Sequence, residues 1–428
     1  MKFSVTRISR GLVAPSGPTP SGVLELSAID KLPVLRGNVQ TLHVYKHGPG
    51  AANVIRQALS KALVSYYPLA GRLRFSDHNR ELIQVACSGD GVWFVEALAD
   101  CTLDDVAYFD DAMSIPYDEL LPVRPQENDG LDPLVQMQVT QFGCNGFVVG
   151  LTFCHTICDG LGAAQFLNAV GELARGAEQP SISPEWCRNF LPQRPTLPLR
   201  PISIPDYQLE PATIDLSLDK IKELKQDFRK QSGGGTCSTF EIVAAVLWRE
   251  RTRAIEPQQD KMKLVFFANV RQLIQKPAPL PKGFYGNCFF PVSVTVSRDI
   301  LTKDEEDEET GLSGVFQVVK LIQEAKAGLA SEFLKWLMMD DVEVEEGDPF
   351  RPELEYGTLF MSEWDRLGFK EVDYGWGKPV HIVPIQGSSV MPVGLVCSPP
   401  APASGIRMRT WCVQQHHTER LLRSMDRL

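Results

Sequence analysis

The sequence predicts an α/β protein made of two domains. Its 428 residues exceed the length that one hydrophobic core normally organises, so two domains are expected. Segments with the alternation of strands are interleaved with segments that have the periodicity of helices. Between Pro180 and Pro211 the chain carries eight prolines, a density that no regular element tolerates. We therefore expect domains at 1–179 and 213–428, joined by a crossover linker at 180–212.

The first domain is expected to begin with short strands and an amphipathic helix. Residues 22–46 alternate short apolar runs with turns, a pattern that favours edge strands. Residues 53–63 place their apolar side chains at helical spacing. The stretch 66–72 contains proline and glycine, so we expect the helix to end there.

A hairpin followed by a helix is the clearest pattern in the first domain. Residues 134–142 alternate apolar and polar side chains, as a half-buried strand does. The Asn-Gly pair after them is a strong signal for a hairpin turn. The returning strand, 147–154, is almost wholly apolar, so we expect it to be central, with both faces covered. Asp159 begins a helix that Gly176 ends.

The second domain is expected to mix strands and helices as well. Residues 214–218 have the pattern of a strand, and 218–230 have the pattern of a helix. Ser238 and Glu241 form a capping box in front of a helix over 242–253. Further strands are expected at 264–270, 288–296, 380–384 and 408–413.

Charge and composition argue against several classes of function. The formal net charge of −10 disfavours general nucleic-acid binding, which needs a basic face. We expect no membrane span and no secretory signal, because no apolar stretch is long enough and the N-terminus runs into charge. A cytoplasmic protein with ten reduced cysteines is therefore expected. Cys154, His155 and Cys158 leave metal binding as a secondary hypothesis, but no second pair completes a zinc set and no metal is expected.

His155, which follows the apolar strand, is the candidate catalytic residue. A neutral imidazole has a reference pKa of about 6.5 and can take a proton from a hydroxyl or amine near neutral pH. The nucleophile so formed would attack an activated carbonyl, and such catalysis is worth on the order of 10² to 10⁴ in rate. The alternative is a buried histidine satisfied by its neighbours. We expect Asp159 to cap the following helix or to pair with an arginine rather than to orient His155.

Two motifs lie far apart in the chain. The first is His155-x-x-x-Asp159-Gly160, and the second is Asp373-Tyr374-Gly375-Trp376-Gly377. Together they resemble the BAHD acyltransferase family of plants, which usually has phenylalanine at the tyrosine position. The resemblance extends, in family order, to segments 66–72, 237–241, 269–271 and 279–287. It implies two chloramphenicol-acetyltransferase-like domains, each a mixed sheet flanked by helices, with a channel between them. It also implies acyl transfer from a coenzyme A thioester to an alcohol or amine.

The resemblance implies roles for individual residues. His155 would be the general base of a direct transfer, and the absence of a G-x-S-x-G turn disfavours a serine acyl-enzyme. Asp159 would pair with Arg271 in a structural role. Trp364 matches a tryptophan that would donate its indole N–H to the oxyanion, and ordinary core packing is the alternative. Asp373, Gly375, Trp376 and Gly377 would shape the domain and the coenzyme entrance. Gly160, the other structural motif residue, would allow a close approach to the backbone, and simple turn-making is the alternative.

Acyl-coenzyme A would be a cosubstrate, and no permanently bound cofactor is expected. Ser238 and Thr239 begin a helix whose free amides and dipole suit a phosphate, and Lys261 or Lys263 lies nearby in sequence. A plain helix cap is the alternative for the two hydroxyl residues. Small-molecule substrates are the expected partners. We expect a monomer, because a channel between domains needs no second chain.

The opening segment 3–30 narrows the expected substrates. It is similar to a subgroup that acts on alcohols, most closely to hydroxycinnamoyl transferases of grasses. This favours transfer of a p-coumaroyl group from coenzyme A to a monolignol, with His43 and Tyr45 on the acceptor side and packing in the sheet as their alternative. Feruloyl, acetyl or benzoyl donors and other acceptors stay open. A coenzyme A-binding regulatory protein is the hypothesis from another class, and the intact His155 argues against it.

Overall fold

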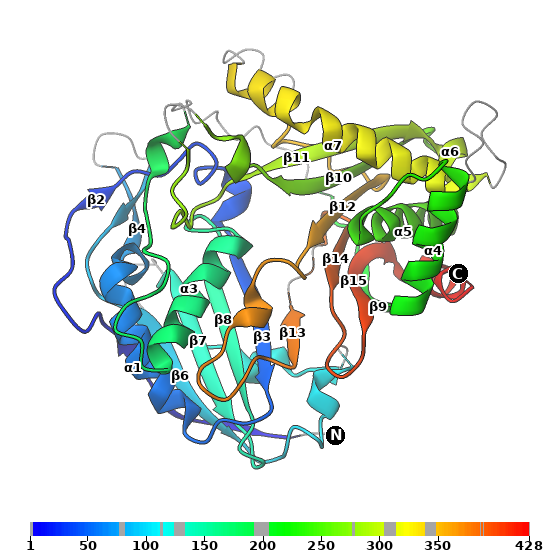
Figure 1. The fold of residues 1–428 in the computed structure, drawn as a ribbon. Helices are drawn as coiled ribbons and strands as arrows, with labels where there is room; N and C mark the ends of the chain where they lie inside the picture. Colours follow the sequence, from blue (N-terminus) through cyan, green and yellow to red (C-terminus); the bar gives the residue numbers. More distant parts are fainter. Residues whose placement is uncertain are drawn as a thin grey trace.

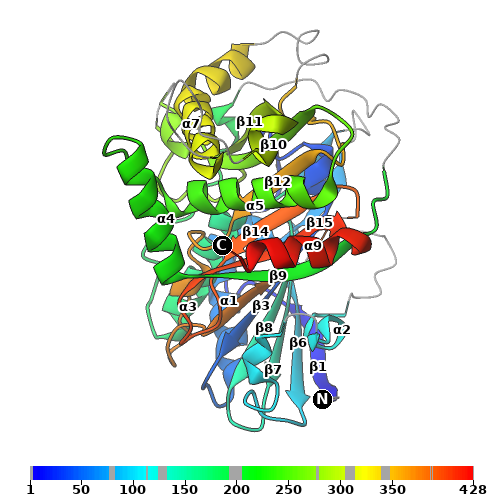
Figure 2. The same ribbon diagram turned by 90° about the vertical axis from the view of Figure 1, so that its right-hand side faces the viewer.

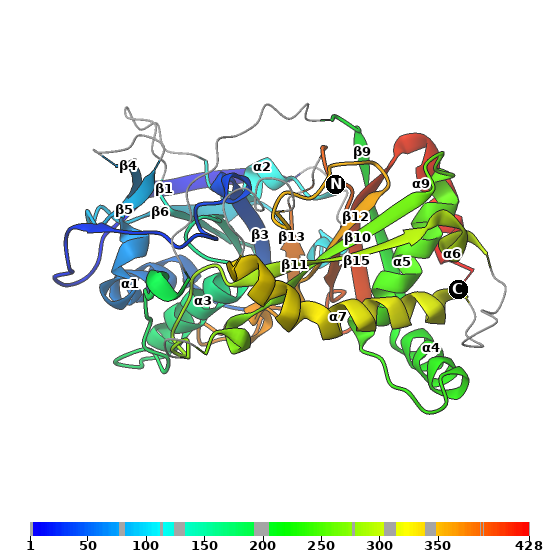
Figure 3. The ribbon, with the colours of Figure 1, turned by 90° about the horizontal axis from the view of Figure 1, so that it is seen from above.

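Two six-stranded mixed sheets lie side by side, and a small three-stranded sheet flanks the first (Figure 1). The computed structural model describes residues 3–76, 82–111, 114–123, 133–191, 205–275, 279–303, 314–338, 348–385, 387 and 389–427. Seen from above, most segments coloured blue to teal form one half and most coloured green to red form the other (Figure 3). The predicted α/β fold with two sheet-based halves is confirmed.

The first sheet carries the strand that leads to His155. Its strands, in spatial order, are β1 (Val5–Val13), β6 (Val92–Ala99), β7 (Val135–Gln141), β8 (Phe147–Cys154), β3 (Asn38–Tyr45) and β13 (His381–Pro384). All neighbours pair antiparallel except β6 and β7. Helices α1 (Ala51–Ser65) and α3 (Gly160–Ala174) share an apolar core with one face. The short helix α2 (Tyr117–Leu120) belongs to a second core on the other face.

The β7–β8 hairpin has the predicted form, with one difference in burial. Asn145 adopts a left-handed φ of 63° at the turn, and β8 is buried along its whole length. The sequence predicts a half-buried β7, but this strand is buried on both faces from Val135 to Thr140. Its polar face is covered by the chain around α2, where Gln138 donates to the carbonyl oxygen of Glu119 at 2.7 Å. β8 lies between β7 and β3 and is central, as predicted.

The prediction of edge strands over 22–46 is confirmed for β2 (Val23–Leu24), at an edge of the small sheet, but is wrong for β3. Strand β3 lies inside the first sheet, with β8 on one side and β13 on the other. Figure 1 shows β13, in orange, beside the blue β3, so the covering strand comes from the far end of the chain. A local sequence pattern carries no information about a partner at that separation, which explains the wrong prediction.

The second sheet has its large apolar core on one face. Its strands, in spatial order, are β11 (Phe289–Ser297), β10 (Lys261–Asn269), β12 (Thr358–Glu363), β14 (Val393–Cys397), β15 (Gly405–Gln414) and β9 (Leu209–Ser217). The helices of this half are α4 (Leu218–Gln231), α5 (Thr239–Ile255), α6 (Arg298–Thr302), α7 (Gly314–Met338) and α9 (Gln415–Met425). Figure 2 shows α4, α5 and α9 in front of the strands. Helix α5 is buried along almost its whole length because α7 and α9 enclose it.

Most predicted elements of the second half are present. The capping box is confirmed, because Ser238 Oγ accepts the Glu241 N–H at 3.2 Å and the Glu241 carboxylate accepts the Ser238 N–H at 2.8 Å. β9 and α4 meet at the predicted junction, Ser217–Leu218. The sequence analysis did not predict helices α7 and α9 or strands β12 and β14.

The remaining regular structure is short. The small sheet contains β2 (Val23–Leu24), β5 (Ile83–Ala86) and β4 (Arg72–Phe75), in that order. Single 3₁₀ turns occur at Pro33–Arg36, Tyr67–Ala70, Ala107–Phe109, Arg188–Phe190, Arg271–Leu273 and Phe369–Glu371. Within the ranges that the structure describes, no helix is both long enough and apolar enough to cross a membrane.

Side chains of β15 tie the two sheets together. Arg407 forms ion pairs of 2.6 Å with both Asp110 and Asp215, and Arg409 donates to the carbonyl oxygen of Pro384 at 2.6 Å. β13 belongs to the first sheet although it lies within the predicted second domain. The boundaries 1–179, 180–212 and 213–428 stay a prediction, and residues 192–204 of the linker lie outside the described residues.

Candidate active site

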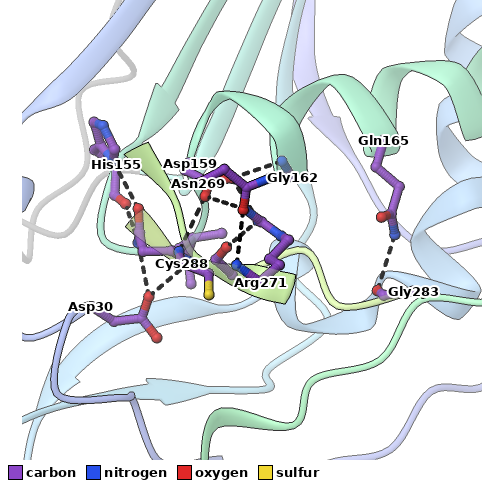
Figure 4. Close-up of polar contacts among 12 residues, drawn as sticks. Asp30, His155, Asp159, Gly162, Gln165, Asn269, Arg271, Gly283 and Cys288 are labelled. Carbon is purple, nitrogen blue, oxygen red and sulfur yellow. Dashed lines mark hydrogen bonds and ion pairs between the residues drawn. The ribbon is translucent and has the colours of Figure 1, made fainter. Parts of the chain in front are cut away.

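His155 lies at the end of the central strand β8. Its backbone N–H donates to the carbonyl oxygen of Gly37 at 3.0 Å, which continues the contact between β8 and β3. The side chain is partly exposed, whereas Cys154 and Thr156 on either side are buried. Figure 4 shows the imidazole at one end of a cluster of polar side chains, directed away from Asp159. The ring is therefore accessible while the chain that carries it is held in the sheet.

Asn287 fixes the position of the proton on the His155 ring. Its amide nitrogen donates to Oδ1 of Asp30 and to the carbonyl oxygen of His155, both at 2.8 Å. Because these partners accept hydrogen bonds, the amide oxygen is the atom that faces Nδ1 of His155, at 3.1 Å. An amide oxygen can only accept, so in the neutral ring Nδ1 carries the proton and Nε2 has the lone pair. The arrangement presents Nε2 as a base.

A buried ion pair lies behind Asn287. Asp30 is fully buried, and its Oδ2 lies 3.1 Å from Nε of Arg188, whose side chain is 2% exposed. Arg188 also donates to the carbonyl oxygen of Ile157 at 2.6 Å and covers the ring of Trp186, 4.2 Å from the ring centroid. Each charge compensates the other, so a buried carboxylate can hold the Asn287 amide in one orientation.

Two glycines allow these segments to meet. A Cβ at Gly162, in the first turn of α3, would lie 1.8 Å from the carbonyl oxygen of Tyr285. A Cβ at Gly286 would lie 1.3 Å from Nη1 of Arg188. A side chain at either position would move the segment before Asn287 away from its neighbours, because protein interiors are close-packed. The two glycines therefore set how closely Asn287 approaches the end of β8.

Asp159 faces Arg271 and not the imidazole. Its carboxylate accepts two hydrogen bonds of 2.8 Å from the guanidinium, one on each oxygen. It also accepts the backbone N–H groups of Gly162 at 3.0 Å and Cys288 at 3.1 Å, so it caps α3 as well. Burial lowers the pKa of Arg271, but the charge and hydrogen bonds of Asp159 outweigh burial and raise that pKa above its ordinary value. Asp159 therefore joins the two halves of the molecule and has no oxygen directed at His155 (Figure 4).

The second motif forms a turn against the first half of the molecule. Oδ1 of Asp373 accepts the backbone N–H of Gly375 at 2.7 Å and that of Gly377 at 2.9 Å. Both glycines have positive φ angles, 112° and 98°, which favour glycine. Trp376 packs edge-on against Phe147 of β8, with ring centroids 6.0 Å apart. These contacts suit the structural role that the resemblance implies.

Trp364 follows the last residue of β12. Its backbone N–H donates to the carbonyl oxygen of Val396 at 2.8 Å, and its ring lies over Phe369 with centroids 6.0 Å apart. Three residues later, Leu367 packs so closely on the start of α3 that a Cβ at Gly160 would lie 2.6 Å from it. The segment that carries Trp364 therefore borders the helix that follows His155. Donation from the indole N–H to an oxyanion stays a prediction.

Known proteins are similar to this chain over nearly its whole length. A family model described as Transferase family matches residues 3–396. Acyl transferase 4 of Oryza sativa subsp. japonica is 43% identical, with 97% of each chain covered. The chain belongs to the BAHD acyltransferase family. As a member of this family it is an acyltransferase with acyl-coenzyme A as cosubstrate.

Other similar proteins differ in what their names say they act on. Myricetin 3-O-glucosyl 1,2-rhamnoside 6'-O-caffeoyltransferase AT2 of Crocosmia x crocosmiiflora is 39% identical, with 98% of each chain covered. Among solved structures, vinorine synthase has a TM-score of 0.74 at 21% identity and covers 99% of this chain and 98% of its own. TRI101 of F. sporotrichioides, solved with coenzyme A and T-2, has a TM-score of 0.69 at 15% identity and covers 94% and 97%. These structures support the fold.

The prediction that His43 and Tyr45 lie on the acceptor side is wrong, because each residue is only 1% exposed. Nε2 of His43 lies 2.8 Å from Oγ1 of Thr41, and the ring packs edge-on against Phe369 with centroids 5.2 Å apart. Tyr45 stacks on Phe147 with centroids 4.6 Å apart. β13 and the second motif cover β3, so packing in the sheet, the alternative interpretation, is correct for both residues.

Ser238 and Thr239, the residues predicted to meet coenzyme phosphates, are found at the start of α5. The hydroxyl of Thr239 accepts from Nζ of Lys225 at 2.7 Å. Lys326 pairs with the capping-box carboxylate of Glu241. Two lysines, from α4 and α7, thus flank a helix N-terminus, and that environment favours a phosphate. Coenzyme binding at this position stays a prediction.

Lys261 and Lys263 do not join that helix start, so the prediction that grouped them with it is wrong. Helix α5 and Leu264 of β10 lie in the same core. Side chains alternate along a strand, so Lys261 and Lys263 point to the opposite face of the sheet. Lys263 pairs with Glu353 at 2.9 Å instead. The two lysines were grouped with the start of α5 because they are near it in sequence, but the alternation of side chains along β10 places them on the other face of the sheet.

The secondary hypothesis of a metal ion at Cys154, His155 and Cys158 finds no support. No three His, Cys, Asp or Glu side chains in the described ranges are arranged to hold a metal. Cys154 is 7% exposed and Cys158 is 3% exposed. Burial raises the pKa of Cys158 well above its ordinary value, which disfavours the thiolate that binds metals.

A cavity of about 330 Å³ flanks α3 and is lined by Leu161, Gln165, Asn168, Glu172 and Leu367 among others. Gln165 spans its wall, donating to the hydroxyl of Tyr66 at 3.1 Å and to the carbonyl oxygen of Gly283 at 3.0 Å, the latter contact being drawn in Figure 4. His155 is not among the lining residues. This cavity is therefore separate from the cluster at the exposed end of β8.

Sequence reasoning missed three residues that position the His155 ring: Asn287, Asp30 and Arg188. Asn287 lies in a segment that carries the family resemblance, and a polar residue just before the apolar start of β11 is a signal that could have found it. Asp30 lies in an irregular segment and Arg188 in a single 3₁₀ turn, where no periodicity marks buried positions.

Proposed function

We propose that this acyltransferase transfers a hydroxycinnamoyl group, p-coumaroyl above all, from coenzyme A to the hydroxyl of a monolignol-type alcohol. His155 is the general base of the reaction. One observation carries this mechanism: the imidazole is partly exposed, and Asn287 holds its Nδ1 so that Nε2 is the basic atom.

A single imidazole can carry both proton transfers. Nε2 takes the hydroxyl proton as the alcohol oxygen attacks the carbonyl carbon of the thioester. After the new C–O bond forms, the C–S bond breaks and the imidazolium returns the proton to the leaving thiolate of coenzyme A. The imidazolium is stabilised while it exists, because Nδ1–H donates to the Asn287 oxygen and the Asp30 carboxylate lies behind that amide. No acyl-enzyme is needed.

The tetrahedral intermediate needs a donor for its oxygen, and Trp364 is our candidate. An N–H aimed at a developing oxyanion contributes about 2.7–4 kcal/mol to lowering the barrier. The partly exposed indole lies on the segment that borders the first turn of α3, directly after His155 and Asp159. This position supports the role.

The choice of a hydroxycinnamoyl donor and a neutral acceptor rests on two points. Two similar proteins, both from Crocosmia x crocosmiiflora, are named caffeoyltransferases, and caffeoyl is a hydroxycinnamoyl group. An acceptor with a carboxylate would need an arginine clamp, and Arg351, the last arginine before Trp364 in the sequence, lies 3.7 Å from Asp348 instead, which favours a neutral alcohol. A benzoyltransferase and an acetyltransferase of Taxus, 34% and 32% identical, make other donors the alternative.

A matrix of donors and acceptors tests this proposal. The purified protein is incubated with p-coumaroyl-, feruloyl-, benzoyl- or acetyl-coenzyme A and with coniferyl alcohol or a matched amine, and products are identified by mass spectrometry. We expect the highest kcat/KM for p-coumaroyl-coenzyme A with the alcohol. A preference for acetyl or benzoyl would contradict the donor, and thiol release without dependence on any acceptor would contradict transfer.

A further inference from the structure

Three phenylalanines form a continuous aromatic surface next to His155. The ring of Phe289 meets the His155 ring edge-on, with centroids 6.2 Å apart. The ring of Phe289 also contacts Phe267, with centroids 5.5 Å apart, and Phe350, with centroids 5.9 Å apart. We call Phe267, Phe289 and Phe350 the aromatic shelf.

Phe267 and Phe289 lie on the face of the second sheet that is not packed on α5, and Phe350, outside the sheet, packs on Phe290 and Trp336 as well. Phe290 and Val292 point into the apolar cores, so Phe289 and Ser293, at alternate positions of β11, point the other way. Phe267 is 42% exposed, whereas Phe290 is 2% exposed and packs on α7. Phe290 therefore lies inside the core, while Phe289 packs at the margin of that core and borders His155.

The exposed rings of the aromatic shelf suit the binding of an apolar ligand group, because a large aromatic side chain is stabilised when its surface is removed from water. Phe289 and Phe350 are each only partly buried, and Phe267 extends the surface beyond them. The distance from the imidazole to the rings suits a substrate whose reacting carbon lies at the base while its own ring lies over the shelf. Aromatic rings pair with centroids about 4.5–7 Å apart.

We propose that the aromatic shelf binds the aromatic ring of the acyl group, and so selects aryl-bearing acyl donors over short aliphatic ones. This inference rests on the proposed function of His155 as the base at which the thioester reacts. The shelf is assigned to the acyl ring and not to the ring of the alcohol because the proposed donors carry an aromatic acyl group, in line with two similar proteins that are named caffeoyltransferases.

Equilibrium binding separates the shelf from the reaction itself. In a His155→Ala background, which removes the base, p-coumaroyl-coenzyme A and acetyl-coenzyme A are titrated by calorimetry against the parent and against Phe267→Ala. We expect Phe267→Ala to raise the Kd of p-coumaroyl-coenzyme A by about three- to tenfold. The Kd of acetyl-coenzyme A should stay within twofold. Phe267→Tyr should restore the parent value, and Phe75→Ala, which removes an exposed phenylalanine of the small sheet, should change neither.

Each other outcome identifies what has failed. If the parent binds p-coumaroyl-coenzyme A more tightly than acetyl-coenzyme A and Phe267→Ala leaves that ratio unchanged, the shelf is wrong while the proposed donor stands. If the parent makes no distinction between the thioesters, the proposed donor fails and the shelf fails with it. A Phe267→Ala effect on coniferyl alcohol and not on the thioester would overturn the assignment to the acyl ring.

Discussion

The two six-stranded sheets differ in how their faces are covered, and the difference separates two tasks. The first sheet has an apolar core on each face, and its central strand leads directly to His155. The second sheet has its large core on one face, while its other face is buried at Val265 and Phe360 but exposed near the β11 edge, at Phe267 and Ser293. A strand covered on both sides holds the imidazole in position. An exposed sheet edge leaves room for a ligand beside it.

Replacing the base tests the first of these tasks and has the largest expected effect. His155→Ala should lower kcat/KM by on the order of 10² to 10⁴, because proton transfer at Nε2 is lost. The side chain is partly exposed, so the thermal midpoint should move little. Product formation is followed by mass spectrometry. His47→Ala, which removes an exposed histidine of the same half, is the matched control, and turnover retained in His155→Ala would remove the base from the mechanism.

Breaking the Asp159–Arg271 ion pair, which joins the two halves of the molecule, should have the largest effect on stability. Asp159→Ala leaves Arg271 without its carboxylate in a largely buried position, and the free energy of unfolding should fall by about 3–5 kcal/mol. Glu353→Ala breaks the exposed pair with Lys263 and should cost less than about 1 kcal/mol. Both are measured by urea unfolding. A fully stable but inactive Asp159→Ala would mean that the carboxylate acts on the reaction directly.

Removing the amide that holds the base should reduce turnover and not substrate binding. Asn287→Ala should lower kcat by about 10- to 100-fold, because a hydrogen bond to a group that becomes charged is lost. KM should stay within twofold. Asn168→Ala is the control. The Asn168 side-chain amide donates to the backbone carbonyls of Ala164 and Gly368 and has no hydrogen bond to His155 or Asp30 among the described contacts. A rise in KM with unchanged kcat would show that Asn287 binds substrate instead of positioning His155.

Mild acid should loosen the first sheet before the second. Burial lowers the pKa of His43 to about 3 and that of His381 to about 4, and these residues lie on the paired strands β3 and β13. Below about pH 6.5 these two histidines bind protons in the unfolded chain but stay neutral in the folded chain. The free energy of unfolding is therefore unaffected above that pH and falls as the pH drops toward 4. At pH 5 each histidine should cost about 2 kcal/mol.

Hydrogen exchange measured by mass spectrometry at pH 7 and pH 5 checks this. After correction for the intrinsic exchange rate, β3 and β13 should lose protection at pH 5 while α5 keeps it. His43→Gln should recover part of the loss. Equal loss in both sheets would assign the acid sensitivity to other groups.

The sequence predicted those parts of the site that local signals determine. The Asn-Gly turn and the apolar run after it located β8, and with it the exposed position of His155 at the strand end. The capping box located the start of α5. Asp159 was assigned to a helix cap or an arginine because a turn separates it from the strand, and the structure contains both contacts.

Local sequence patterns could not predict features that depend on contacts between residues far apart in the chain. His43 and Tyr45 are buried because β13 and the second motif, far along the chain, cover β3. Asn287 holds the base only because Gly162 and Gly286 let three segments approach. The lysine error is of another kind, since the alternation of β10 was visible in the sequence and places Lys261 and Lys263 on the face opposite Leu264.

The pairing of β13 with β3 limits how this enzyme can be recombined with its relatives. A chimera cut at the proline-rich linker would receive its sixth strand and the Asp373 turn from one parent and the sheet that they complete from the other. Residues 369–384 pack with the N-terminal half and should be exchanged together with it. A hybrid that ignores this would mismatch the side chains behind the base, even if both parents use the same substrates.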